Sequence, residues 1–167
     1  MTYCVLLASS RSDGNTRGLV DRAFPFGVAA LEDLAALNVG FYSYTFDNES
    51  DDFFPLIKRM LAHDVWIVAT PVYWYTMSAQ AKVFLDRLTD LLEIHKAEGR
   101  LLRGKSLAVL ATGTEAALPA SFDEPLRLTC DYLGMHFRGS HYTQCRGTAA
   151  AAHEDAAQVF IESLLAT

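Results

Sequence analysis

The chain has 167 residues, with 14 Lys and Arg against 20 Asp and Glu, so its formal charge is −6. Hydrophobic residues make up 51% and charged residues 20%, a balance that excludes a disordered chain. The acidic excess and the lack of any basic block argue against a nucleic-acid partner. The length suits a single domain over residues 1–167 with its own hydrophobic core.

The cysteines and the N-terminus point to a cytoplasmic protein. Cys4, Cys130 and Cys145 are odd in number and form no C-x-x-C pair, so we expect free thiols in a reducing compartment. No signal-peptide pattern opens the chain. The longest apolar run, residues 65–77, contains Pro71 and is too short to span a bilayer, so we expect no membrane partner.

Continuous apolar runs predict buried strands. Residues 3–8, 65–69 and 106–111 are apolar without alternation, as parallel strands covered on both faces are. Residues 29–34 and 135–143 are weaker candidates.

Helical spacing fills the segments between these strands. A first helix begins near Asn15 and ends before Pro25, because the residue before a proline disfavours the helical conformation. The Ala-rich residues 148–152 lead into a last helix. Four further apolar faces follow the helical period: Phe53, Phe54, Ile57, Met60 and Leu61; Phe84, Leu88, Leu91 and Leu92; Phe122, Leu126, Thr129, Cys130 and Leu133; and Ala157, Phe160, Ile161, Leu164 and Leu165.

Alternating strands and helices with right-handed crossovers form a doubly wound parallel sheet. Five strands in this length favour an α/β, flavodoxin-like fold with strand order 2-1-3-4-5 and helices on both faces. Ligands of such folds bind at the carboxyl ends of the strands, where the strand order reverses. The segments of interest are therefore residues 9–16, 71–78 and 112–118.

The first of these segments has the composition of a phosphate site. Backbone N–H groups at a helix start are unpaired and carry the positive end of the helix dipole. Gly14 allows close approach of the backbone, and further donors come from Ser9, Ser10, Arg11 and Thr16. The alternative is a capped loop without a ligand, in which Asn15 or Thr16 caps the helix.

A tyrosine-phosphatase loop fits poorly. Such loops need C-x5-R, whereas six residues separate Cys4 from Arg11. Cys4 also lies at the start of its strand, too far from the loop to attack a phosphate there.

Aromatic residues follow the third strand. Tyr73, Trp74 and Tyr75 offer flat faces to a planar ring, or they fill a corner of the core or a subunit contact. Ser78 is a candidate cap for the next helix. After the fourth strand, a third wall of a ring pocket or an ordinary turn is formed by Thr112, Gly113, Thr114 and Glu115.

Together these residues resemble the family of NAD(P)H-dependent FMN reductases and flavodoxin-like NAD(P)H oxidoreductases, over nearly the whole chain. The matching motifs are Ser9-x-Arg11-x-x-Gly14-Asn15-Thr16 and Pro71-x-Tyr73-Trp74-x-x-x-Ser78-x-x-x-Lys82-x-Phe84-x-Asp86-Arg87. The resemblance implies non-covalent FMN whose phosphate is held by Ser9, Arg11, Asn15 and Thr16. It places the flavin ring along Pro71, Val72, Tyr73 and Trp74, with Thr112, Gly113, Thr114 and Glu115 on its other side.

The resemblance also implies an activity. An enzyme of this kind passes hydride from NAD(P)H to FMN and then electrons to a small-molecule acceptor such as a quinone or flavin, usually as a homodimer or homotetramer. The cofactor carries this chemistry, so no catalytic side chain is assigned. The alternatives are a flavodoxin-type electron carrier without NAD(P)H turnover and a flavin-free binding module.

Three smaller features carry expectations of their own. Residues 41–52 contain none of the cysteines that hold an iron–sulfur cluster in one branch of the family, and their aromatic side chains either pack over a partner's flavin or are solvated. Lys82 and Asp86, with Arg87, form a surface ion pair or orient the flavin loop or the dimer. His136 and His141 stand at an odd spacing in a strand, so we expect them on opposite faces and no metal pair.

Overall fold

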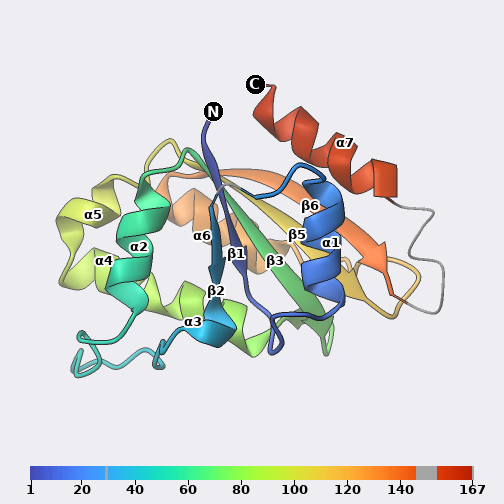
Figure 1. The fold of residues 1–167 in the computed structure, drawn as a ribbon. Coiled ribbons are helices and arrows are strands. Elements are labelled where there is room, and N and C mark those ends of the chain that lie inside the picture. The colour runs from blue at the N-terminus through green and yellow to red at the C-terminus, as the bar shows by residue number, and fades with distance from the viewer. Residues whose placement is uncertain (29, 146–153, 167) are drawn as a thin grey trace.

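The computed structural model describes residues 1–28, 30–145 and 154–166 (Figure 1). The Ala-rich residues 148–152 lie outside these ranges. The described elements are β1 (Tyr3–Leu7), α1 (Asn15–Ala23), β2 (Leu31–Asp33), the 3-10 helix η1 (Leu34–Ala36), α2 (Phe53–Leu61), β3 (Val65–Tyr73), β4 (Thr76–Met77), α3 (Ala79–Arg87), α4 (Asp90–Glu93), α5 (Lys96–Arg100), β5 (Ser106–Gly113), α6 (Glu124–Leu133), β6 (His136–Gln144) and α7 (Glu154–Leu165).

Five parallel strands form the sheet in the order β2-β1-β3-β5-β6. This is the predicted order 2-1-3-4-5, so the flavodoxin-like fold is confirmed. The two-residue strand β4 was not predicted, and it pairs antiparallel with the end of β3. The strand order reverses between β1 and β3, which places the expected ligand site at their carboxyl ends.

Helices cover both faces of the sheet, with α1 and α7 on one side and α2, α3, α4 and α6 on the other (Figure 1). Along β1 the side chains alternate between the two layers. Cys4 and Leu6 enter the core beneath α2 and α3, whereas Val5 and Leu7 enter the core beneath α1. The predicted helix faces are largely buried, as Phe53, Ile57 and Met60 of α2 show. Among the described residues, no helix is long and apolar enough to cross a membrane.

The two central strands run further than predicted. β3 and β5 stay paired as far as Pro71 and Thr112; β3 then continues to Tyr73 by pairing with β4, and β5 to Gly113 by pairing with β6. Residues 71–73 therefore belong to a strand, and the expected loop is a hairpin that returns through β4. Of the three aromatic residues, Tyr73 is therefore held in a paired strand, whereas Trp74 and Tyr75 form the turn.

The helix predicted around Phe84 and Leu91 is broken into α3 and α4, with α5 following. At the break the N–H groups of Thr89 and Leu91 bond carbonyls three residues back, at 3.2 and 3.1 Å. Phe84, Leu88 and Leu91 are all buried, so the predicted apolar face persists across the break. The Arg87 Nε donates to Asp90 Oδ2 across the break, at 2.8 Å.

A bulge in β6 overturns the expectation for the two histidines. Leu107 pairs with Phe137 and Val109 with Ser140, so β6 holds one residue more than β5 over this span. The bulge includes Gly139, whose φ is +87°. His136 and His141 consequently pair with positions of β5 that face the same side of the sheet. No group of three or more metal-ligating side chains is found in the described part of the chain.

Arg87 lies in a buried ion-pair network rather than in the expected surface or flavin-loop role. Its side chain is 1% exposed and contacts Asp51 at 2.5 Å, Asp90 at 2.8 Å and the Gly40 carbonyl at 3.1 Å. Burial opposes ionisation of Asp51, but hydrogen bonds, above all from Arg87, keep its pKa below the usual value. Arg87 thereby anchors the segment that precedes α2.

Lys82 and Asp86 form the expected surface ion pair, at 2.5 Å and with both side chains exposed. The aromatic segment of residues 41–52 is partly packed and partly solvated. Tyr42 makes edge contacts with Tyr44 and Phe46, while Phe41 and Tyr44 remain 78% and 89% exposed.

Candidate functional site

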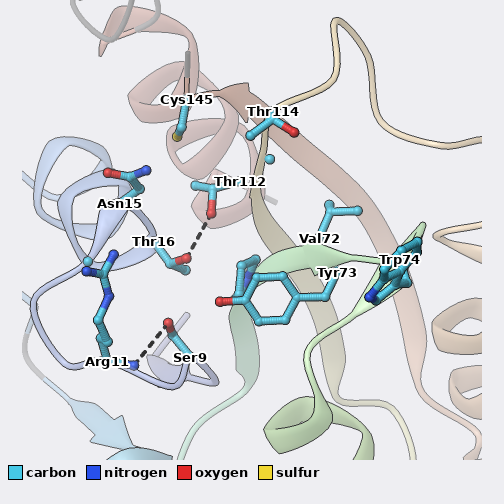
Figure 2. Close-up of a pocket in the computed structure, with 13 residues that line it drawn as sticks. Ser9, Arg11, Asn15, Thr16, Val72, Tyr73, Trp74, Thr112, Thr114 and Cys145 are labelled. Atoms are coloured by element: carbon cyan, nitrogen blue, oxygen red, sulfur yellow. Dashed lines mark hydrogen bonds between the residues drawn. The ribbon is translucent and has the colours of Figure 1, made fainter. Parts of the chain in front are cut away.

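A cavity of about 530 Å³ opens at the carboxyl ends of β1, β3 and β5 (Figure 2). All of the expected site residues line it except Ser10 and Glu115. The lining residues are Ser9, Arg11, Gly14, Asn15, Thr16, Pro71, Val72, Tyr73, Trp74, Thr112, Gly113, Thr114 and Cys145. Its volume falls within the range of about 300–1,000 Å³ that is typical of small-molecule sites.

Three residues differ from the expected lining. Ser10 is exposed and lies outside the cavity. Glu115 lines an adjoining cavity of about 180 Å³, which shares Val72 and Trp74 with the first. Cys145 was missed, although its position just after the last strand could have indicated it. Its N–H donates to the Gly113 carbonyl at 2.7 Å, which brings it to the mouth of the cavity.

The first loop leaves its donors free for a ligand. The N-cap of α1 is Gly14, which has no side chain to cap the helix, so neither Asn15 nor Thr16 is the cap that the alternative expected. The Arg11 backbone N–H donates to Ser9 Oγ at 3.4 Å, which shapes the loop. Within the described chain the Arg11 guanidinium has no ion-pair partner, and it lies beside the start of α1 in Figure 2.

A buried hydroxyl pair joins the first loop to the third. Thr16 Oγ1 and Thr112 Oγ1 are 2.8 Å apart, and both residues are buried (Figure 2). Either hydroxyl can donate. If Thr16 donates into the cavity, Thr112 can donate to Thr16, so both groups remain hydrogen-bonded when a ligand enters.

Ser78 joins the first loop to the hairpin. Its Oγ accepts from the Ala81 N–H at 3.1 Å, which confirms the predicted cap of α3. The same hydroxyl donates to the Ala8 carbonyl at 2.6 Å, at the end of β1. Its N–H donates to Thr70 Oγ1 at 3.1 Å. One buried serine thus fixes the relative positions of two walls of the cavity.

The aromatic hairpin has an unusual backbone. Trp74 and Tyr75 both have positive φ, 48° and 69°, as the two central residues of a type I′ turn do. Asn and Gly normally fill these positions, because bulky side chains are strained there. Strained backbone of this kind is common at functional sites, and here it lies at the rim of the cavity.

The exposed side chains of this hairpin rule out the alternative in which they fill a corner of the core. Tyr73, Trp74 and Tyr75 are 47%, 91% and 65% exposed, so they fill no corner of the core. Figure 2 shows the Tyr73 hydroxyl pointing toward the first loop, with Trp74 at the far end of the cavity. The flat faces of the hairpin are therefore open to a ligand or to another chain.

The third wall needs a glycine. A Cβ at Gly113 would lie 2.8 Å from the Tyr142 hydroxyl oxygen and 3.3 Å from Val72 Cβ, so β5 could not pass between them with a larger residue. The Tyr142 hydroxyl donates to the Glu115 carbonyl at 2.8 Å, and Gln144 Nε2 to the Thr114 carbonyl at 3.0 Å. These bonds from β6 hold residues 114–115 at the rim.

Neither the Cys4 thiol nor the Cys145 thiol has the character of a nucleophile. Burial raises the pKa of Cys4 to about 12, and Cys4 is 1% exposed at the opposite end of β1, which excludes a phosphatase mechanism. Burial also raises the pKa of Cys145, against an opposing effect of Arg22. Both thiols are therefore protonated at neutral pH.

The fold and the cavity together define a flavodoxin-like protein with a phosphate-type loop and an aromatic strand facing one space. The family model described as NADPH-dependent FMN reductase matches residues 1–148. The chain therefore belongs to the NADPH-dependent FMN reductase family.

A curated relative supports the same family. YwqN of Bacillus subtilis (strain 168), whose name describes an NAD(P)H-dependent FMN-containing oxidoreductase, is 31% identical over 103 residues. The alignment covers 55% of this chain and 54% of YwqN, so it spans about half of either protein.

Solved structures share the fold. The Trp repressor binding protein of Bacillus subtilis superimposes with a TM-score of 0.76 at 22% identity, covering 95% of this chain and 97% of the other. General stress protein 14 of Treponema denticola, solved in complex with FMN, gives 0.72 at 17% identity and 99% coverage of both chains. An NADPH-quinone reductase from P. pentosaceus gives 0.68 at 16% identity, covering 96% of this chain and 97% of the other.

Proposed function

We propose that this chain is an FMN-dependent NAD(P)H oxidoreductase that reduces a small-molecule acceptor such as a quinone or a free flavin. The observation that carries the proposal is the meeting of a phosphate-type loop and an aromatic strand in one cavity. Bound FMN would supply the redox chemistry, accepting a hydride from NAD(P)H and passing electrons to the acceptor.

The residues present fit this cofactor. Uncapped N–H groups at the start of α1 and the unpaired Arg11 guanidinium are suited to a dianionic phosphate, with Ser9, Asn15 and Thr16 adding side-chain donors. Gly14 leaves the loop backbone open to the phosphate. The exposed Ser10 has no contact with the cavity, so we assign it no direct part.

The ring would lie between the second and third walls. Pro71, Val72 and Tyr73 present the edge of β3, while Thr112, Gly113 and Thr114 present the end of β5. Trp74 and the adjoining cavity beside Glu115 are where an acceptor or nicotinamide would approach. The chain binds and orients the reactants, and the hairpin shields them from water on one side.

The wider setting is also part of the proposal. We place the enzyme in the cytoplasm, with residues 1–167 forming one FMN-binding domain. The exposed hairpin and the exposed Phe41 and Tyr44 favour a homodimer or homotetramer, because large solvent-facing apolar side chains mark association surfaces.

The visible absorption spectrum tests the proposal. We expect the purified protein, or the protein incubated with FMN, to show a flavin band that bleaches when NADPH or NADH is added without oxygen. A band that persists with both donors would favour a flavodoxin-type electron carrier. A protein that remains colourless after incubation with FMN would overturn the assignment of the cavity.

A further inference from the structure

A second cavity lies near the start of β5, toward the opposite ends of the strands from the first cavity. It has a volume of about 210 Å³ and is bounded by α4, α5, the turn after α5 and the end of α6. Nearby, β5 begins at Ser106 and runs eight residues to Gly113 at the first cavity. At about 3.3 Å per residue β5 spans roughly 25 Å, so the second cavity is separate from the first.

Three cations line this second cavity: Lys96, Arg100 and Arg103. All three are exposed, and none forms an ion pair or a side-chain hydrogen bond with any residue that the structure describes. The chain carries six more acidic than basic residues, so carboxylates are not scarce. None of the residues that line the cavity is a carboxylate, although Glu98 lies between Lys96 and Arg100 on α5.

Two features of α5, which bears Lys96 and Arg100, lower its intrinsic stability as a helix. Lys96 and Arg100 are four positions apart, so their like charges repel across one helical turn. Gly99 between them is a poor helix former. A Cβ at this glycine would collide with the Leu91 carbonyl oxygen, so glycine is needed for α5 to lie directly on α4. The packing therefore holds the two charges beside the cavity.

The other walls are apolar and aromatic. Leu91, Leu92 and Leu133 form the apolar part, and Tyr132 of α6 lies at the rim with 78% of its surface exposed. The backbone at the end of α6 is already bonded, for example by the Met135 N–H to the Cys130 carbonyl at 2.8 Å. The cations are therefore not needed to satisfy that helix end.

We propose that this cavity binds a small phosphate monoester that carries a planar ring, about the size of a nucleoside monophosphate. The planar guanidinium groups of Arg100 and Arg103 suit bidentate contact with phosphate oxygens, and Lys96 adds a point charge. Tyr132, an exposed aromatic residue in the lining beside the leucines, is suited to contact the ring. The cavity is smaller than a typical enclosed site, so part of the ligand stays in solvent and binding is submillimolar rather than tight.

The test is a titration of the purified protein with AMP, followed by backbone amide chemical shifts. We expect the shifts to centre on Gly99 and Gly134, and AMP to bind at least tenfold more tightly than either adenosine or inorganic phosphate. Shifts centred on Gly14 and Gly113 would instead place AMP in the first cavity and overturn the proposal. Because the two sets of glycines report on different sites, failure here is distinct from failure of the proposed redox function.

Variants complete the test. The double variant R100Q/R103Q should weaken AMP binding at least tenfold, and Tyr132→Ala should bring the affinity for AMP down to that for inorganic phosphate. Arg17→Gln, which removes one exposed cation on α1, is the matched control and should leave binding unchanged. All of these side chains are exposed, so the fold should persist. Equal affinity in R100Q/R103Q and the unmodified protein would overturn the proposal, as would no binding of AMP up to about 10 mM.

Discussion

The hydroxyls of Thr16 and Thr112 meet at 2.8 Å, and this one buried contact links segments that are 96 positions apart in the sequence. It joins the start of α1 to the end of β5, so two walls of the candidate flavin cavity share a hydrogen bond. The contact has a structural role, and under the proposed function it also holds Thr16 ready to donate to a phosphate.

Thr112→Val removes one hydroxyl of this pair and keeps the side-chain shape. We expect the free energy of unfolding to fall by about 1 kcal/mol and the affinity for FMN to fall about fivefold, because a buried hydroxyl loses its partner. Urea denaturation and fluorescence titration with FMN measure the two effects. Thr129→Val is the control, since its hydroxyl bonds only a carbonyl on its own exposed helix. Equal losses in both variants would refute the special role of the pair.

Arg11→Ala tests the phosphate assignment. Hydrogen bonds to charged groups contribute about 1.5–3 kcal/mol, so we expect FMN to bind roughly 10- to 150-fold more weakly. The ring contacts remain, so the spectrum of any bound flavin should change little. Arg17→Ala removes a neighbouring cation that pairs with Asp21 and should bind FMN normally. If Arg11→Ala kept the original dissociation constant, the loop would not hold the phosphate.

Trp74→Gly should relieve strain at the tip of the hairpin. Each side chain held at positive φ costs on the order of 1–3 kcal/mol, and glycine adopts this conformation freely. We therefore expect a higher midpoint of thermal unfolding together with a lower rate of acceptor reduction. Trp74→Leu removes the aromatic ring but keeps the strained Cβ, so it should lose activity without the gain in stability. Matching stabilities for these two variants would show that the turn stores no strain.

Arg87→Met breaks the buried network that anchors residues 40–51. Leaving two buried carboxylates without their cation should cost about 3–5 kcal/mol in the free energy of unfolding. The control is Arg127→Met, because Arg127 pairs with Glu124 and Asp131 on the exposed face of α6, where such pairs contribute about 0–1 kcal/mol. Chemical denaturation of the two variants distinguishes the cases, and similar costs would contradict the buried role of Arg87.

The same network makes stability depend on pH. The pKa of Asp51 lies below its ordinary value of 3.8, because the hydrogen bond from Arg87 and the N–H groups of Phe53 and Gly40 outweigh the effect of burial. A depressed carboxyl pKa stabilises the fold above the unfolded-state value, and this contribution is lost as pH falls through the folded-state pKa. We expect the stability difference between the unmodified protein and Asp51→Asn to be constant near neutral pH and to shrink below about pH 4. A difference that stayed constant down to about pH 3 would be inconsistent with this assignment.

Much of the fold could be predicted because its strands are buried on both faces. The apolar runs in β1, β3 and β5 have no other use in a chain of this composition, and their alternation with helices sets the strand order. The position of the first loop at the cavity could also be predicted, because its candidate donors are local in sequence, although Ser10 lies outside the cavity and the phosphate assignment stays a prediction. The cap of α3 by Ser78 was predicted for the same reason, whereas the bond from Ser78 to Ala8 was not.

The remaining features depend on contacts between distant residues. The partner of Arg87 is Asp51, 36 positions earlier, and no local pattern distinguishes this arginine from the surface pair of Lys82 and Asp86. The extra residue at Gly139 reverses the alternation of side chains along β6. A single glycine in a strand does not show by itself where the register with the neighbouring strand shifts. Cys145 lies just after the last predicted strand, but its pairing with Gly113, which brings it to the cavity, depends on the register of β5 and β6.

The hairpin formed by the end of β3 and β4 projects from the sheet, and in the pairing of the strands its tip is attached only through its own two legs. The phosphate-type loop is instead locked into the core through Thr16 and Ser78. A substitution at the tip therefore leaves in place the hydrogen bonds that hold the phosphate-type loop. Under the proposed function, the acceptor approaches the hairpin while the FMN phosphate is held by the loop. Related proteins can therefore change the acceptor through substitutions in the hairpin and keep the same redox chemistry.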